Sequence, residues 1–323
     1  MTPDLIPIIL NYLQLIFFIY VGITVLMLFV FSFASIFRYK PIVNPDNPIN
    51  RIALLIPAYK EDDVILEVIE SALEHNYPKD KFDVILIADS FNPDTLKKFV
   101  DLDIILFAKD FKISTKSRAL NYALQRLENS YDIACILDAD NLMEDDFLLN
   151  VNNAFCNGFA AVQGHRIAKN LNTSFAVLDA ISEEINNKIF RKGQRVLGLS
   201  AFLIGSAMAF DYQLFKTMMA EVEVVGGFDK ELEMRLLAMR MKTEYLPDAK
   251  VLDEKVQNAR VFSKQRRRWL SAQFNFFGKK FLPSLKQLFT QGNFEYFFKT
   301  WPNTKTLKMF NFYLMLFFHL VHI

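Results

Sequence analysis

Cysteine and histidine are scarce in this sequence of 323 residues. It contains two cysteines, Cys135 and Cys156, and four histidines. Two thiols do not imply a disulfide framework, and neither residue type shows the spacing of a metal-binding motif. A reduced, cytosolic environment is therefore expected for the main domain.

The sequence also has no large excess of basic over acidic residues, or of acidic over basic residues. The 37 Lys and Arg residues balance 36 Asp and Glu residues, which leaves a formal net charge of +1. Without a basic excess, nothing in the sequence indicates nucleic acid as a partner. A G-x-G-x-x-G motif is absent after the first predicted strand, which argues against a dinucleotide-dependent oxidoreductase.

Apolar residues are abundant instead. They make up 52% of the chain, including 33 phenylalanines, while the charged fraction is 23%. This mixture is typical of a soluble domain combined with membrane segments. No charged residue lies between Leu5 and Phe37, and about 20 apolar residues suffice to span a bilayer. A secretory signal peptide would have a basic start and a shorter apolar stretch, so residues 1–40 are predicted to form an N-terminal transmembrane helix.

Basic residues follow this apolar segment but do not precede it. Arg38, Lys40 and Arg51 lie on its C-terminal side. The positive-inside rule then places the residues from 38 onward in the cytosol. We therefore expect an integral protein of the inner, or plasma, membrane whose main domain is cytosolic.

The C-terminal part of the sequence is apolar again. Residues 305–323 are predicted to form a partial or truncated membrane segment, because the apolar run is short for a span. Before it, residues 276–304 mix aromatic side chains with lysines, which is typical of a helix lying among lipid headgroups. An ordinary amphipathic surface helix is the alternative for that segment.

Between the membrane segments, short apolar runs alternate with stretches of helical periodicity. The predicted strands are 51–57, 82–90, 103–108, 132–140 and 160–165. The predicted helices are 62–76, 94–100, 117–127 and 145–155. This alternation predicts an α/β fold over residues 50–275, with a mixed, mainly parallel sheet flanked by helices. In such sheets, ligands bind where the carboxyl ends of the strands emerge.

Two acids stand one residue apart where the fourth predicted strand ends. Side chains at i and i+2 of an extended segment lie on the same side, so Asp138 and Asp140 repel each other unless a cation lies between them. Mg²⁺ prefers oxygen ligands and usually binds one or two carboxylates together with substrate phosphates. We therefore predict that Asp138 and Asp140 bind Mg²⁺ or Mn²⁺ beside a diphosphate. A turn that caps the next helix is the alternative.

Two further polar residues stand at the ends of predicted elements. Asp89 ends an otherwise apolar strand, where it is expected to bind a nucleobase or ribose; capping the following loop is the alternative. Lys116 lies just before a predicted helix, where its ammonium and the helix dipole both favour a phosphate. A solvated surface position is the alternative for Lys116.

In order and spacing, these features resemble the nucleotide-sugar half of a family 2 glycosyltransferase. The matching segments are "PAYKE" at 57–61, Asp89, "KSRALN" at 116–121 and "DAD" at 138–140. The family has the GT-A fold, an α/β nucleotide-sugar-binding domain. The resemblance therefore implies that fold and a nucleotide-sugar ligand.

Two further segments extend the resemblance over residues 50–275. "FLIGSAMAF" at 202–210 is similar to the family's segment bordering the acceptor site. "QRRRW" at 265–269 matches the Q-x-x-R-W pattern of membrane-embedded members, such as polysaccharide synthases and ceramide glucosyltransferase-like enzymes. Arg266 and Arg267 are expected at the surface, near lipid headgroups. The implied nucleotide-sugar-binding residues are Pro57, Tyr59, Glu61, Asp89, Lys116, Asp138, Gln265, Arg268 and Trp269.

Asp229 stands in "GGFDKELEMRL" (226–236), at the place of the family's catalytic aspartate. The resemblance implies that Asp229 is the general base that deprotonates an acceptor hydroxyl group. A helix N-cap is a compatible second role. One departure is Phe228, which occupies a position where the family commonly has Glu.

The resemblance implies a membrane-bound, inverting, metal-dependent hexosyltransferase. It would move a sugar from a nucleotide-sugar, expected to be a UDP-sugar, to a hydroxyl group of a polysaccharide or a lipid. Phe228 motivates an alternative, a non-catalytic GT-A-fold membrane subunit that regulates a partner synthase. The predicted membrane helices are too few to form a channel for an exported polymer. Three alternatives follow: the chain is truncated, it works with a partner membrane subunit, or its product is a glycolipid or a short glycan.

Overall fold

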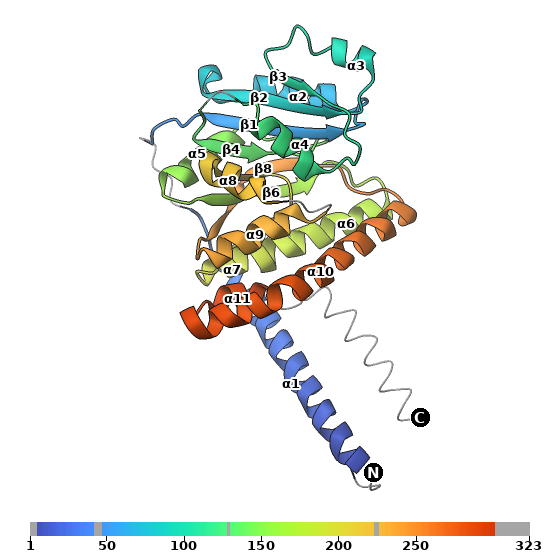
Figure 1. Cartoon of the computed structure of the whole chain (residues 1–323), viewed down its shortest axis with the longest axis vertical. Coiled ribbons are helices and arrows are strands. Elements are labelled where there is room, and N and C mark those ends of the chain that lie inside the picture. The colour runs from blue at the N-terminus through green and yellow to red at the C-terminus, as the bar shows by residue number, and fades with distance from the viewer. Residues whose placement is uncertain (1–4, 42–46, 128–129, 223–225, 301–323) are drawn as a thin grey trace.

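The computed structural model describes residues 5–41, 47–127, 130–222 and 226–300. Its main body is a layered α/β domain, and helix α1 (Leu5–Ala34) projects from one end of that domain (Figure 1). The predicted membrane segment at 305–323 lies outside the described residues.

The centre of the domain is a mixed sheet in which the described residues form eight strands, in the order β3-β2-β1-β4-β7-β6-β8-β5. The strands are β1 (Ile52–Tyr59), β2 (Phe82–Asp89), β3 (Ile105–Ala108), β4 (Ile133–Ile136), β5 (Leu142–Met143), β6 (Ala161–Ala168), β7 (Met208–Asp211) and β8 (Thr243–Asp253). Strands β1 to β4 run parallel and β6 runs parallel to β8, whereas β7 is antiparallel to both of its neighbours. This topology confirms the predicted α/β fold with a mixed, mainly parallel sheet.

Helices cover both faces of the sheet. The described helices are α2 (Ile65–Glu74), the 3₁₀ turn η1 (Lys79–Lys81), α3 (Pro93–Lys97), α4 (Lys116–Leu124), α5 (Phe147–Cys156), α6 (Ser174–Ile185), the π-helix η2 (Asn186–Gly193), α7 (Gln194–Val196), α8 (Tyr212–Ala220), α9 (Phe228–Ala238), α10 (Ala259–Gln291) and α11 (Phe294–Thr300). Leu54 of β1 packs into a core shared with α2 and α5, and Leu55 packs into the core on the other face, shared with α4 and α8. Burial on both faces explains why the central strands are continuously apolar.

Two departures from the predicted elements bear on function. Strand β4 ends at Ile136, so Asp138 and Asp140 lie in the turn after the strand and not on an extended segment. The sequence pattern also does not predict α6, because a polar side chain lies on the inner face of this helix and apolar side chains are exposed. Asp179 is buried on its inner face, while Ile181 is exposed.

Among the described residues, helix α1 packs against the domain through its C-terminal turns. Phe31 and Ala34 are buried there, whereas many of its other apolar side chains are exposed. Its partner is η2, where a Cβ atom on Gly193 would lie 2.2 Å from the carbonyl oxygen of Phe31, so glycine is required for this approach. Within the described residues, Pro7–Ala34 is the one helical segment long and apolar enough to cross a membrane.

Helices α10 and α11 lie at the end of the domain from which α1 emerges (Figure 1). α10 is continuous from Ala259 to Gln291, so the predicted division between 50–275 and 276–304 does not coincide with a break in the structure. Gly292, in the left-handed conformation with φ of 65°, ends α10. The short α11 then packs against α9 and α10.

Candidate active site

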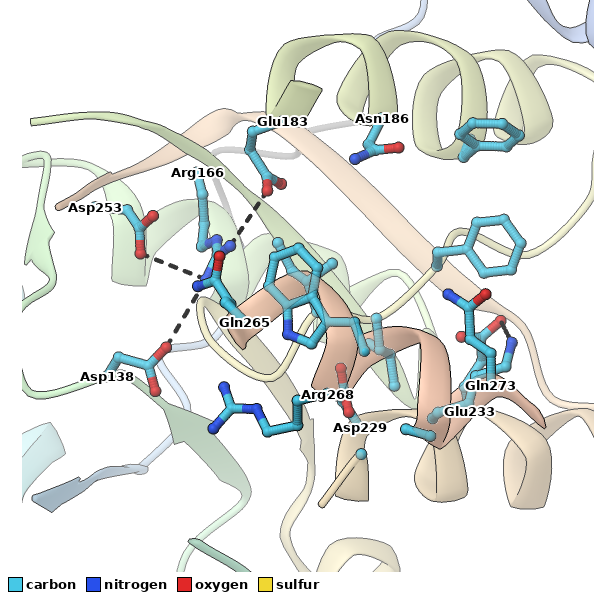
Figure 2. Close-up of a pocket in the computed structure, with 18 of the residues that line it drawn as sticks. Asp138, Arg166, Glu183, Asn186, Asp229, Glu233, Asp253, Gln265, Arg268 and Gln273 are labelled. Carbon is cyan, nitrogen blue, oxygen red and sulfur yellow. Dashed lines mark hydrogen bonds and ion pairs between the residues drawn. The ribbon is translucent and has the colours of Figure 1, made fainter. Parts of the chain in front are cut away.

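A cavity of about 380 Å³ lies between the carboxyl edge of the sheet and the helices that pack against that edge (Figure 2). Residues near the ends of β4, β6 and β8 form one part of its wall. Residues of α6, η2, α9, α10 and the loop before β7 form the rest. This is the edge at which ligands bind in open α/β sheets.

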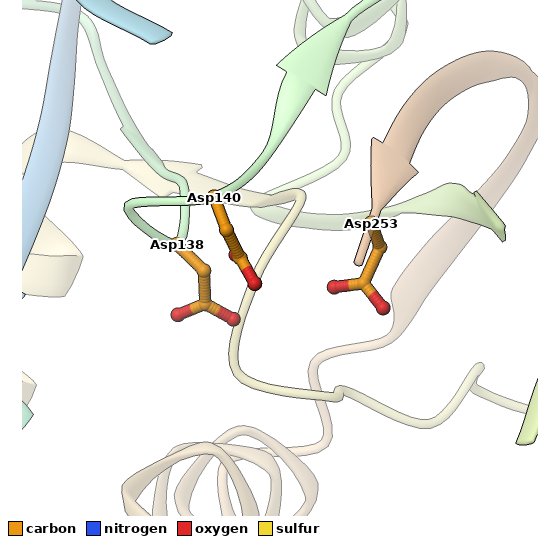
Figure 3. A group of neighbouring side chains, drawn as sticks. All are labelled: Asp138, Asp140 and Asp253. Atoms are coloured by element: carbon orange, nitrogen blue, oxygen red, sulfur yellow. The ribbon is translucent and has the colours of Figure 1, made fainter. Parts of the chain in front are cut away.

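Three carboxylates, those of Asp138, Asp140 and Asp253, converge on one side of the cavity (Figure 3). One ligand atom from each lies within 4.8 Å of the others. Burial, followed by the charges of Asp138 and Asp253, raises the pKa of Asp140 to about 7. Three hard oxygen ligands at this spacing fit a divalent cation such as Mg²⁺ or Mn²⁺. Asp253 is not among the residues predicted from the sequence, because the strand that it ends, β8, is not among the predicted strands.

Two basic side chains approach the same carboxylates. Lys116, at the start of α4, donates a hydrogen bond to Asp138 and is therefore not a solvated surface lysine. Nη1 of Arg166 lies 3.4 Å from Oδ1 of Asp253 and 3.8 Å from Oδ2 of Asp138. Its Nη2 lies 3.2 Å from a carboxylate oxygen of Glu183 on α6. These cations would also complement the negative charge of a diphosphate.

Asp229 lies in the first turn of α9 and lines the cavity. The N-cap is Gly227, in the left-handed conformation with φ of 74°, so Asp229 does not take the N-cap role expected as an alternative. Burial raises the pKa of Asp229 above its ordinary value, although a hydrogen bond from the backbone of Lys230 opposes this change. A carboxylate with a raised pKa is suited to accept a proton from a hydroxyl group.

Phe228 precedes this carboxylate but belongs to the core. It is buried against the apolar face shared by the sheet, α4 and α8. The ammonium of Lys116 lies 5.5 Å from the centre of its ring, which is a cation–π distance. Phe228 therefore contacts a predicted site residue from the side of the core.

One face of α10 presents Gln265, Arg268 and Trp269 to the cavity. Their i, i+3 and i+4 spacing places them on the same side of the helix. Arg266 departs from its expected surface role: its guanidinium donates a hydrogen bond of 2.6 Å to Asp179 and lies 4.7 Å from the ring centre of Trp269. The reason is that the buried carboxylate of Asp179 needs a charged partner.

The other predicted residues stand at the carboxyl ends of β1 and β2, outside the cavity lining: Pro57, Tyr59, Glu61 and Asp89. Tyr59 and Asp89 are paired in the parallel register of the two strands. One carboxylate oxygen of Asp89 accepts hydrogen bonds from the Ser90 hydroxyl (2.9 Å) and the Phe111 backbone (3.3 Å), so Asp89 also caps the following loop. Because β1 lies between β2 and β4, these residues extend the edge that carries the carboxylate cluster.

The chain matches the family model described as "Glycosyltransferase like family 2" over residues 48–272. "Probable glycosyltransferase YdaM" of Bacillus subtilis (strain 168) is 24% identical over 240 residues, which are 68% of this chain and 54% of that protein. "Probable glucomannan 4-beta-mannosyltransferase 3" of Oryza sativa subsp. japonica is 25% identical over 248 residues, which are 71% of this chain and 44% of that protein. The chain thus spans about half the length of these relatives.

A solved structure has a similar fold. The mannosyltransferase PcManGT from Pyrobaculum calidifontis, in complex with GDP-Man and Mn²⁺, superposes with a TM-score of 0.57. The match covers 81% of this chain and 72% of that chain, at 19% identity. At this identity the likeness concerns the fold, and it supports the GT-A-type architecture.

Proposed function

This chain belongs to the glycosyltransferase-like family 2, and from that premise we propose that it is a membrane-bound, inverting glycosyltransferase. It moves a sugar from a nucleotide-sugar to a hydroxyl group of a polysaccharide or lipid acceptor, with Mg²⁺ or Mn²⁺ bound. One observation carries the proposal: the base Asp229, the carboxylate cluster and Arg268 all line one cavity. That is the set of groups that sugar transfer from a diphosphate requires.

Asp138, Asp140 and Asp253 are the residues that would hold the metal ion, because their carboxylates converge. When bound, the ion supplies positive charge that offsets the charge of the donor diphosphate as it leaves. The raised pKa of Asp140 reflects burial first and then the charges of Asp138 and Asp253, and a bound cation would offset both costs of ionising this carboxyl. PcManGT was solved with Mn²⁺, which supports the same class of ion here.

Asp229 accepts the proton of the acceptor hydroxyl while that oxygen forms a bond to the anomeric carbon of the donor sugar. The bond between the anomeric carbon and the diphosphate breaks, and its electron pair leaves with the nucleoside diphosphate. Attack from the face opposite the leaving group inverts the anomeric configuration. Lys116 and Arg268 stabilise the negative charge on the leaving diphosphate.

The nucleotide occupies the sheet edge beside the cluster, formed by Pro57, Tyr59, Glu61 and Asp89. Asp89 is buried at the end of β2, where its carboxylate accepts hydrogen bonds from a nucleobase or a ribose. A UDP-sugar is the donor expected from the sequence. GDP-mannose is the second candidate, because it is the ligand named with PcManGT.

Helix α1 anchors the enzyme in the inner, or plasma, membrane. The basic residues after α1 keep the domain at 50–275 in the cytosol. The second half of α10 lies among lipid headgroups, because it exposes the large apolar side chains of Leu282 and Phe289 at the end of the domain where α1 emerges (Figure 1). A lipid acceptor, a growing glycan or a partner membrane subunit would reach the cavity from this side.

Turnover by the full chain, purified in detergent, tests the proposal. A panel of UDP- and GDP-sugars is offered with and without Mn²⁺ or Mg²⁺, and nucleoside diphosphate release is measured. We expect metal-dependent release from one donor, and its loss in Asp138→Asn and Asp140→Asn. Asp94→Asn, an exposed acid on α3, is the matched control. Absence of both turnover and donor binding would instead favour the non-catalytic subunit that regulates a partner synthase.

A further inference from the structure

Lys299 on α11 is a buried cation that the proposed mechanism does not use. Its side chain is fully buried, at 0% exposure. Its Nζ donates a hydrogen bond to the carbonyl oxygen of Ser200 and lies 3.5 Å from a carboxylate oxygen of Glu233 on α9. It also lies 4.2 Å from the centre of the Phe202 ring. One side chain thus joins α11 to α9 and to the loop before β7.

The same helix holds that loop a second time. Glu295, one turn before Lys299, accepts a hydrogen bond from the backbone N–H of Ser200. Both backbone polar groups of Ser200 are therefore bound by α11. The residues that follow, Phe202, Leu203 and Ile204, line the cavity. α11 is thus one of the elements that hold this wall, together with β8, whose Thr243 carbonyl accepts a hydrogen bond from the Ala201 backbone.

The groups that Lys299 contacts lie on the side of the cavity that carries the base. Glu233 also lines the cavity and follows Asp229 by one helical turn on α9. The ammonium of Lys230, next to Asp229, lies 3.4 Å from Glu233 and 4.9 Å from the Phe202 ring centre. Two cations, one from α9 and one from α11, thus hold the same carboxylate and the same ring.

Burying the charged ammonium of Lys299 in this space costs free energy, because the charge loses its hydration. Burial lowers the pKa of Lys299 to about 8, although the charge of Glu233 opposes the change. An apolar side chain of similar length would fill the volume without the desolvation cost. The value of the ion pair therefore lies in fixing the groups that it touches.

We propose that Lys299 is a positioning residue for the acceptor. By helping to fix Ser200, Phe202 and Glu233, it sets the wall beside Asp229 against which the acceptor lies, and so gives α11 a part in acceptor binding. The inference rests on the proposed transferase function and goes beyond it, since the residues proposed for the donor lie elsewhere, at the ends of β1, β2 and β4, at the start of α4 and on the first half of α10.

The test compares Lys299→Met with Lys286→Met, an exposed lysine on α10, in the full detergent-purified chain. Three quantities are measured for each: donor hydrolysis without acceptor, the KM for cellotetraose or mannotetraose, and hydrogen exchange of residues 199–207. For Lys299→Met we expect the acceptor KM to rise about tenfold and donor hydrolysis to stay within about twofold of wild type, the pattern of a selectively displaced acceptor wall. Residues 199–207 are expected to exchange faster, while Lys286→Met behaves as wild type.

The double variant Lys299→Met/Glu233→Gln separates positioning from simple packing. If Lys299 acts through Glu233, the two changes are not additive, and the acceptor KM of the double variant does not exceed that of Lys299→Met. The inference is overturned if donor hydrolysis and acceptor use fall together, or if residues 199–207 exchange at the wild-type rate in Lys299→Met. Failure of the proposed function would appear differently, as a wild-type chain that turns over no donor.

Discussion

At the scale of single residues, Asp253 is the carboxylate that completes the candidate metal site. It ends β8, and its oxygen lies with those of Asp138 and Asp140. We expect Asp253→Asn to raise the Mn²⁺ concentration for half-maximal turnover by about 10- to 100-fold, because a metal loses a charged oxygen ligand. The measurement is a Mn²⁺ titration of nucleoside diphosphate release. Asp248→Asn, an exposed acid on the same strand, is the control, and an unchanged titration in Asp253→Asn would contradict the site.

The raised pKa of Asp229 links activity to stability. A carboxyl whose folded-state pKa lies above its unfolded value costs stability once it is ionised, and the cost grows as pH rises above the unfolded pKa. Asp229→Asn is therefore expected to lower kcat by about 10²- to 10⁴-fold and to raise Tm at neutral pH. The gain in Tm should shrink as pH falls toward the ordinary range of an aspartate. Thermal unfolding of both proteins at neutral and acidic pH checks this, and a less stable Asp229→Asn at neutral pH would refute it.

Short sequence motifs predict some residues of the site and do not predict others. Asp138, Asp140, Asp229 and Arg268 belong to short patterns, and the structure brings them to one cavity. The residues that surround them carry no local pattern, because β6, α6 and β8 meet only in three dimensions. These residues are Arg166, Glu183 and Asp253.

At the scale of elements, the contact between α1 and η2 depends on one glycine. A Cβ atom on Gly193 would meet the Phe31 backbone, which cannot move aside as a side chain can. We expect Gly193→Ala to destabilise the protein by about 1–3 kcal/mol through overpacking. Gly278→Ala on α10 is the matched control, since nothing lies within 4 Å of its Cβ position. It should be neutral or should stabilise by about 0.5–1 kcal/mol.

Thermal unfolding in detergent measures both glycine variants. Equal Tm values for Gly193→Ala and Gly278→Ala would show that the close approach of α1 to η2 does not exist in solution.

Sequence periodicity predicts some helices and strands of this fold and does not predict others. Most strands and helices between residues 51 and 156 have one apolar face or are buried on both faces, so their patterns predict them. The short elements η1 and β5 in this range are not predicted, because two or three residues carry no periodicity. α6 escapes prediction because its inner face lines a polar cavity and carries Asp179 and Glu183. The predicted domain boundary at 275 falls inside α10, because this helix continues from Ala259 to Gln291 with the same mixture of aromatic and basic residues.

At the scale of the whole molecule, α10 and α11 lie at the end of the domain from which α1 emerges, and α3 lies at the opposite end (Figure 1). Leu282 and Phe289 of α10 are 70% and 81% exposed, and Val100, which follows α3, is 74% exposed. We expect Leu282→Glu and Phe289→Glu to lower turnover several-fold in liposomes but not in detergent, because they oppose insertion among lipids. Val100→Glu should have no effect in either medium. A similar loss in both media would mean that α10 does not contact the bilayer.

The π-helix η2 connects two parts of the structure, the cavity wall and helix α1. Asn186, Phe190 and Arg191 of η2 line the cavity, and Gly193 of the same helix touches the backbone of α1. A spanning helix longer than the local hydrocarbon thickness responds by tilting, within limits set by its packing partners. If α1 spans a bilayer, as proposed, its contact with Gly193 would pass a change of tilt to the η2 residues that line the cavity.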